Sequence, residues 1–303
     1  MNALTLKSAL LVSAALAYWP AQALATPLLG SDLASFAVLG ATPSVTNTGA
    51  TTLVGDVGVS PAASITGQAT LTVNGINALL NPGDVHLNDA TAISAQSQLV
   101  TAMSNLGLLG PGTLEPADLV GLTLPPGVYT VPAGISNLTG TLTLDGLGNA
   151  NAAWVFQMPS TLITSPGAVV NVINTGAGAG VYWNVGSSAT LDTTTSFEGN
   201  ILALASITLN HAATIDCGRA LAQTGAVTMD NNTVNAGDCS ASGEEGSNGL
   251  SGGLDVTTTP EGTVVSFLPF APISSVPEPA TLLLFGFGLT GLFAARKRFA
   301  GVA

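Results

Sequence analysis

Short segments of alternating apolar and polar residues dominate the middle of this chain. Residues 142–144 and 207–209 both follow the order apolar, Thr, apolar, and Gly, Pro and Asn interrupt the segments at short intervals. Successive side chains of a β-strand point to opposite faces, so the apolar residues are expected to point inward and the short polar ones outward. The pattern predicts a fold made mostly of short β-strands.

Several of these segments repeat. Residues 199–203 resemble residues 218–222, and residues 207–210 resemble residues 227–230, at offsets of 19 and 20 positions. A β pattern with a period near 20 residues indicates a solenoid, in which each coil buries its apolar side against its neighbours. On periodicity alone, an irregular sandwich of short strands remains the alternative.

One segment has a helical pattern instead. From residue 88 to residue 106, apolar residues recur at helical spacing, and Leu99 and Val100 lie on the apolar side. Asn88 is a candidate N-cap, Asp89 suits the first turn, and Gly107 stands where a C-cap glycine is expected. We predict one long helix that lies along the solenoid and covers one flank.

The first 25 residues are typical of a secretory signal. A short start containing Lys7 precedes an apolar run, and Ala23-Leu24-Ala25 provides the small residues that signal peptidase accepts. The apolar run is short of the ~20 residues that cross a bilayer, which favours cleavage after Ala25 over a membrane anchor.

The other end of the chain carries a sorting signal. Pro277-Glu278-Pro279 precedes an apolar stretch at 280–295, and Arg296-Lys297-Arg298 follows it. An apolar stretch with basic residues on its C-terminal side is typical of a stop-transfer segment. The arrangement resembles the PEP-CTERM tail of Gram-negative bacteria, which implies an exosortase-type processing enzyme, transient membrane anchoring, and a product that is secreted or held at the cell surface or outer membrane. An ordinary single-span anchor is the alternative.

The exported part of the chain is poor in charge. Of five basic residues in the chain, four lie in the two terminal signals. Residues 26–276 then hold Arg219 against 16 carboxylates, a formal charge of 1 − 16 = −15. Nucleic-acid binding is excluded, because it requires clustered Lys and Arg. With only 7% charged residues, Thr, Ser, Asn, Ala and Gly must cover much of the surface.

Composition and the two cysteines complete the domain prediction. Residues 32–239 form the folded domain, residues 240–276 have the composition of a flexible linker, and residues 277–303 form the tail. An oxidising compartment favours a Cys217–Cys239 disulfide, worth roughly 3 kcal/mol, over two free thiols.

An ordered set of segments resembles a known family. The set comprises residues 36–40, 55–61, the helical segment, 124–129, 185–190, 197–203 and 218–222. In this order they resemble the bacterial and fungal ice-binding proteins of the DUF3494 type. The resemblance implies a discontinuous right-handed β-helix with three faces and one long α-helix alongside. It also implies that the strands before the helix pack next to the last coil, and that ice or ordered water is the partner.

A flat β face could present short hydroxyl and methyl groups as a regular grid to ice. From the alternation we assign one column to Thr143, Thr190, Thr208 and Thr228, and a parallel column to Thr141, Ser188, Ser206 and Ala226. The register of Thr161 and Thr164 stays open. The alternative is that these residues simply occupy outward strand positions, where Thr has a high propensity.

The sequence gives little support for a catalytic function. His86 and His211 are the only histidines, and no Ser or Cys nucleophile motif accompanies either one. His211 is expected to be a solvated turn residue, and Arg219 is expected to form an ion pair with Asp216 or Asp230, or to contact carbonyls. No catalytic residue, cofactor or metal site is predicted. The alternative function is a surface adhesin or matrix protein that binds exopolysaccharide.

Overall fold

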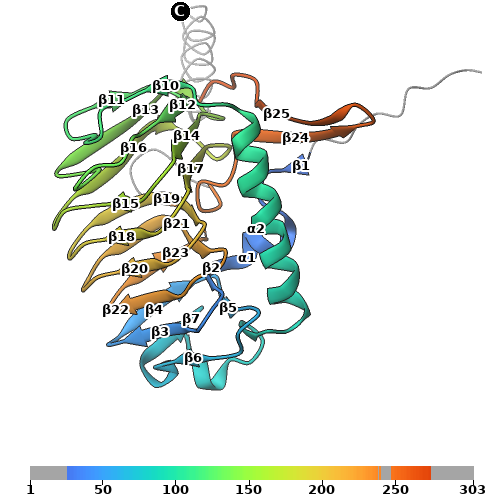
Figure 1. The fold of residues 1–303 in the computed structure, drawn as a ribbon, viewed down its shortest axis with the longest axis vertical. Helices are drawn as coiled ribbons and strands as arrows, with labels where there is room; N and C mark the ends of the chain where they lie inside the picture. The colour runs from blue at the N-terminus through green and yellow to red at the C-terminus, as the bar shows by residue number, and fades with distance from the viewer. Residues whose placement is uncertain (1–25, 238, 240–246, 274–303) are drawn as a thin grey trace, which may run out of the picture.

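The computed structural model describes residues 26–237, 239 and 247–273, and its centre is a solenoid of parallel β-strands with one long helix alongside (Figure 1). The expected solenoid fold is therefore confirmed. The expected signal at residues 1–25 and the tail at 277–303 lie outside the described residues.

Each coil contributes strands to three faces. The helix face, which α2 (Ala90–Leu108) covers, consists of β10 (Thr113–Leu114), β12 (Gly127–Thr130), β14 (Ala153–Met158), β17 (Gly180–Val185), the second halves of β19 (Ser196–Ala203) and β21 (Thr214–Ala222), β2 (Phe36–Gly40), β5 (Asp56–Val59) and β9 (Val85–Leu87).

The second face, named the Thr face below, is a separate sheet of six parallel strands. In spatial order they are β15 (Leu162–Ile163), β18 (Ala189–Leu191), β20 (Ile207–Leu209), β22 (Val227–Asp230), β3 (Val45–Thr48) and β6 (Ile65–Thr66).

The third face contains β11 (Thr123–Leu124), β13 (Thr141–Asn149), β16 (Val169–Thr175), the first halves of β19 and β21, β23 (Thr233–Asn235), β4 (Thr51–Val54) and β7 (Leu71–Val73). β8 (Ile76–Asn77) pairs antiparallel with β7 at the end of this stack.

The coils do not follow the order of the sequence. β2, β3 and β4, which precede the helix, pair with β21, β22 and β23 of the last coil. α2 carries the chain past these strands to the opposite end of the solenoid, where β10 and β11 begin the next set of coils (Figure 1). This is the discontinuity that the family resemblance implied.

Stacked aromatic rings fill part of the solenoid interior. Tyr129, Phe156 and Trp183 occupy equivalent positions on β12, β14 and β17, and Phe197 lies next to Trp183. The ring centroids of Phe156 and Trp183 are 4.0 Å apart. Aromatic rings that stack from one coil to the next give the interior a continuous apolar column. This column stabilises the packing of neighbouring coils.

The long helix forms where its pattern predicted it, with shifted ends. Asp89, rather than Asn88, is the N-cap, and its carboxylate accepts a hydrogen bond from Ala92 N at 2.9 Å. Gly107 lies inside the helix and Leu109 is the C-cap. Val100 is 48% exposed, so the prediction that it faces the solenoid is wrong. The buried contact surface is made of small and apolar residues, namely Ala92, Ala95, Leu99, Ala102 and Leu106.

Residues 240–276 do not form a linker throughout. β24 (Leu254–Thr259) and β25 (Gly262–Phe267) form an antiparallel hairpin, and β1 (Thr26–Pro27) pairs with β24. The prediction of a flexible linker is wrong over this hairpin. Alternating residues such as Leu254 and Val256 pack against the helix side of the molecule, a contact that depends on distant residues. The remaining helical elements are short: α1 (Ser31–Ser35), η1 (Gln68–Thr70) and η2 (Ala78–Leu80).

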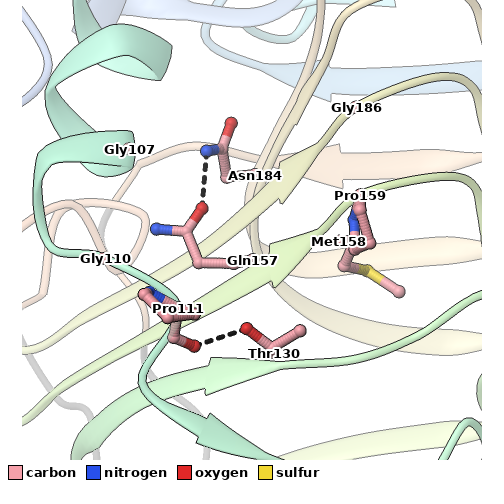
Figure 2. Close-up of a pocket in the computed structure, with 9 residues that line it drawn as sticks. All are labelled: Gly107, Gly110, Pro111, Thr130, Gln157, Met158, Pro159, Asn184 and Gly186. Carbon is pink, nitrogen blue, oxygen red and sulfur yellow. Dashed lines mark hydrogen bonds between the residues drawn. The ribbon is translucent and has the colours of Figure 1, made fainter.

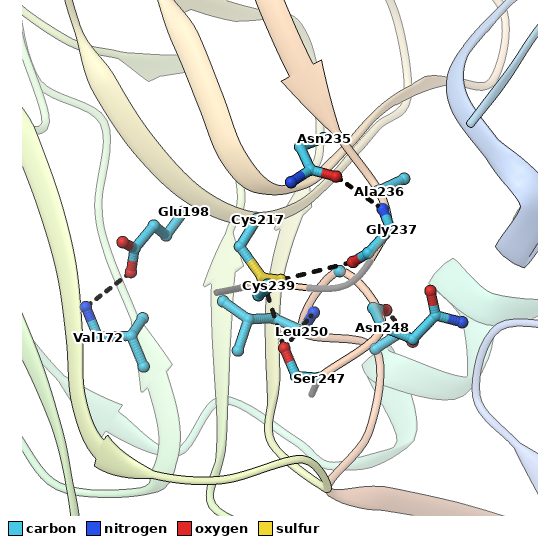
Figure 3. Close-up of a disulfide and its surroundings, with 12 residues drawn as sticks. Val172, Glu198, Cys217, Asn235, Ala236, Gly237, Cys239, Ser247, Asn248 and Leu250 are labelled. Atoms are coloured by element: carbon cyan, nitrogen blue, oxygen red, sulfur yellow. Dashed lines mark hydrogen bonds between the residues drawn. A yellow bond between two sulfur atoms is a disulfide. The ribbon is translucent and has the colours of Figure 1, made fainter. Parts of the chain in front are cut away.

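Arg219 holds the segment after residue 246 against the solenoid, and the disulfide lies beside this contact. Cys217 on β21 is bonded to Cys239, with Ser247 and Leu250 beside the pair (Figure 3). Arg219 is fully buried and donates to Asn200 Oδ1 and to the carbonyl oxygens of Ala34, Ala236, Asn248 and Gly249. Of the two expected roles of Arg219, the contact with carbonyl oxygens is therefore the one observed, and the ion pair with Asp216 or Asp230 is not formed. Asp216 instead accepts hydrogen bonds from Ser196 and Thr214, and Asp230 contacts His211.

Candidate functional site

The outward positions of the Thr face form a straight central column. Parallel pairing places one residue of each strand beside the equivalent residue of the next, from β15 at one end to β6 at the other. Five of the six are threonines, and the full column is Ile163, Thr190, Thr208, Thr228, Thr46 and Thr66.

A second column of short residues runs beside the first. Its members stand two positions before those of the central column, and the carbonyl oxygens of Ser188, Ser206, Ala226 and Ser64 accept backbone hydrogen bonds from the neighbouring strand, for example Ser206 O from Ala189 N at 2.9 Å. The column consists of Thr161, Ser188, Ser206, Ala226, Ser44 and Ser64. Neither column contains a charged or long side chain.

The inward side chains fix these columns in place. Ala189, Ile207, Val227 and Val45 alternate with the outward residues and are at least 99% buried. Packed interiors resist displacement, and a β-branched Thr side chain has few χ1 rotamers, so the outward groups are held in a regular array.

The far edge of the Thr face is polar and partly charged. Asp192 and Asn210 stand two positions after the central column, and Asn210 Nδ2 donates to Asp192 Oδ1 at 3.0 Å. On the next strand, Asp230 lies 3.2 Å from Nδ1 of His211, whose side chain is 61% exposed. These carboxylates bound the uncharged part of the face on this side.

The structure separates the eight residues that the sequence assigned to one face. It brings Thr190, Thr208, Thr228, Ser188, Ser206 and Ala226 together, whereas Thr141 and Thr143 lie on β13 of the third face, beside Val169 and Asn171. Placing these two on the same face was wrong, because strands on two different faces of a solenoid have the same alternation.

Sequence reasoning also missed residues of this face. Thr46 and Thr66 extend the central column, Ser44 and Ser64 extend the second one, and Thr161 joins the second column while Thr164 is buried and contacts Thr195. The Ser-Val-Thr order at 44–46 and the Ser-Ile-Thr order at 64–66 match Ser206-Ile207-Thr208, a signal that could have located both.

A hollow of about 460 Å³ lies at the C-terminal end of α2 (Figure 2). Its central amide, Gln157, accepts from Asn184 Nδ2 at 2.8 Å and donates to Leu106 O at 2.6 Å. Thr130 on its floor donates to the carbonyl oxygen of Pro111. These groups satisfy one another and tie the helix end to the sheet, so we assign the hollow a structural role.

The histidines and acids do not form a metal centre within the described ranges. His86 lies 2.7 Å from Asp89 and 3.8 Å from Asp56, but no group of three or more His, Cys, Asp or Glu residues there is placed to hold a metal ion. The same part of the chain has no helix that is both long and apolar enough to cross a membrane.

Comparison with known families gives two matches. The sequence model of the family described as Ice-binding-like matches residues 39–235, and that of the PEP-CTERM protein-sorting motif matches residues 275–298. The first match covers all strands of the Thr face, and the second begins shortly after the last described residue.

Individual proteins with similar sequences and structures agree with the first of these matches. An ice-binding protein from Nostoc sp. (strain HG1) is 42% identical over 282 residues, which covers 92% of this chain and 90% of that protein. The crystal structure of an ice-binding protein from an Antarctic biological consortium superimposes with a TM-score of 0.61 at 39% identity, covering 69% of this chain and 91% of that one. One from the Antarctic ascomycete Antarctomyces psychrotrophicus gives 0.60 at 38% identity, covering 68% and 96%.

Proposed function

Because this chain belongs to the Ice-binding-like family, we propose that it binds ice through the Thr face, as an antifreeze, recrystallisation-inhibiting or ice-adhesion protein. The observation that carries the proposal is the register of the central column, in which five threonines from consecutive strands follow one another without a charged residue. Ice binding forms no covalent bond, so the proposed function requires no catalytic group or cofactor.

The spacing of the face suits a crystalline partner. Neighbouring strands lie ~4.8 Å apart, and alternate residues on one strand are separated by roughly 6.7 Å, so the two columns form a regular grid on the sheet. Methyl groups on this grid can enforce a cage of ordered water, and hydroxyl groups can anchor it. Since Thr is stiff at χ1, little side-chain entropy is lost when the ordered water joins an ice lattice.

The composition of the face also distinguishes ice from other partners. A long charged side chain would roughen the surface and hold water in a different geometry, and the two columns contain none. The similar proteins described above are ice-binding proteins, and they give no support to the alternative of an exopolysaccharide-binding adhesin.

We further propose that the protein works outside the cytoplasm. In this view the signal at residues 1–25 is removed after Ala25, and an exosortase-type enzyme recognises Pro277, Glu278 and Pro279 within the matched sorting motif. The product would then be secreted or held at the surface of a Gram-negative cell.

Thermal hysteresis and ice-affinity measurements on the purified chain from Thr26 to Ile273 test the function. We expect measurable activity, which the double variant Thr208→Tyr/Thr228→Tyr loses because two bulky rings interrupt the grid. Thr143→Tyr, on the third face, is the matched control and should keep the activity. If the unmodified chain leaves ice growth unaltered, the proposed function is wrong. If the unmodified chain is active and the double variant stays active too, the assignment of the face is wrong.

A further inference from the structure

The segment after the disulfide follows one corner of the solenoid. Leu250 O accepts a hydrogen bond from Val181 N, Ala179 O accepts one from Gly252 N, and Arg219 donates to Gly249 O. These partners all lie where the third face passes into the helix face. In a coil with three faces, this corner is opposite the Thr face.

The chain leaves the described structure at the same corner. After the hairpin, residues 269–273 lie against the turn between β13 and β14. Ile273 N donates to Gly148 O at 3.0 Å, Ala150 N donates to Ala271 O at 2.6 Å, and Asn151 Nδ2 donates to Pro269 O at 3.0 Å. The position of Ile273, shortly before the sorting motif at 275–298, is therefore fixed on the side away from the Thr face.

Exposed apolar side chains surround this exit. Phe270 is 66% exposed, Ile273 is 44% exposed, and Leu147, in the irregular stretch of β13 between Asp145 and Asn149, is 65% exposed. Leu147 has a φ of 54°, a conformation that leucine adopts rarely. Its backbone N–H donates a hydrogen bond to Asp145 Oδ1 at 2.9 Å. Asn or Gly would suit this backbone conformation better and would expose less apolar surface, so an apolar contact outside the folded domain would explain the leucine.

We propose that Leu147, Phe270 and Ile273 form a foot that rests on the surface of a lipid bilayer while the tail is inserted in it. Between Ile273 and the start of the apolar stretch at Ala280 the chain can reach at most about 25 Å, so an inserted tail keeps the foot near the bilayer. The strongly negative charge of residues 26–276 would not draw the domain onto anionic lipid, which leaves apolar contact as the holding force.

This arrangement gives the anchored protein a defined orientation. With its foot on the bilayer, the protein presents the opposite Thr face to the medium, where ice would be met. The inference rests on the proposed function for the insertion of the tail and the role of the Thr face, whereas the lipid contact itself can be tested without ice.

Tryptophan variants of the chain from Thr26 to Ala303, incorporated in phosphatidylcholine vesicles, test the foot. Trp154 and Trp183 are at least 99% buried and give a constant background. With brominated lipids in the outer leaflet, we expect Phe270→Trp and Leu147→Trp to lose their added emission and Thr208→Trp to keep it. Leu80→Trp is the matched control, because Leu80 is apolar and 77% exposed but follows β8 near the opposite end of the solenoid.

Three outcomes would overturn the proposal. Unquenched emission at residues 147 and 270 would show that the foot does not touch lipid. Equal quenching at residue 80 would show that any exposed apolar surface adsorbs to the vesicles. If the chain did not sediment with the vesicles, the tail would not be a membrane anchor. A thermal-hysteresis measurement on the Phe270→Trp variant, free of lipid, reports the ice function separately.

Discussion

Thr228 on β22 lies directly beside Thr46 on β3, so two residues from distant parts of the sequence are neighbours in one column of hydroxyl and methyl groups. β22 ends the set of coils that follows the helix, and β3 belongs to the coils that precede it. The Thr face is therefore continuous across the point where the chain itself is not.

Thr46→Tyr should reduce thermal hysteresis about as much as Thr208→Tyr does. The two residues occupy equivalent positions in the central column, although the sequence pattern assigned only Thr208 to it. Thr48→Tyr is a useful control, since Thr48 lies on the same strand but at the polar edge of the face, beside Asp230. Unchanged hysteresis in the Thr46 variant would mean that the coils before the helix do not contribute to the ice contact.

Ile163→Thr should raise the activity. Ile163 is the one residue of the central column without a hydroxyl group, and it pairs with Thr190 at the end of the sheet. Threonine has a similar branched shape, so the substitution adds an anchoring hydroxyl without disturbing the strand. Ile163→Val, which changes shape but adds no hydroxyl, is the control. Recrystallisation inhibition measured over a dilution series would detect the change, and equal endpoints for both variants would argue against it.

Arg219→Met should destabilise the fold by about 3 kcal/mol or more, because it leaves several buried carbonyl groups and Asn200 without their donor. Burial lowers the pKa of Arg219 to about 10, so the guanidinium still carries its charge at neutral pH. Arg219→Lys keeps the charge but cannot reach all acceptors, and we expect an intermediate loss. Urea unfolding followed by circular dichroism measures both, and a loss below 1 kcal/mol for the methionine variant would contradict the assignment.

Asp89 should contribute stability to the helix N-terminus in a pH-dependent way. Burial alone would raise the pKa of this carboxyl, but hydrogen bonds from Ala92 N and His86 outweigh burial, and the pKa is lowered below its usual 3.8. A lowered pKa in the folded state means that the stabilisation is complete at neutral pH and is lost as the pH falls through that value. Asp89→Ala should cost about 1 kcal/mol at pH 7.

Asp89→Asn is the matched control for this effect, since Asn can cap a helix but does not titrate in this range. The difference in unfolding free energy between the native chain and the Asn variant should shrink as the pH is lowered from 6 toward about 3, near the ordinary carboxyl range. A difference that stays constant across this range would show that the charge of Asp89 does not matter.

Much of this protein was determined by local sequence pattern. Alternation gave the strands, the period near 20 residues gave the coils, and helical spacing gave α2 to within two residues at either end. The repeat also placed Thr208 beside Thr228, and the apolar runs with their flanking motifs separated the targeting segments from the domain. These features need only information within about one coil, because strand direction and helix faces follow from neighbouring residues.

The tertiary structure decided which face each strand joins. Thr143 and Thr208 have the same alternating surroundings, yet β13 pairs on the third face and β20 on the Thr face, because face identity depends on the hydrogen-bonded neighbour and not on the alternation. In the same way only the fold placed Thr46 next to Thr228 and set the exit of the chain at the corner opposite the Thr face. Parallel pairing is made between residues far apart in sequence, so its register becomes visible only when the coils are stacked.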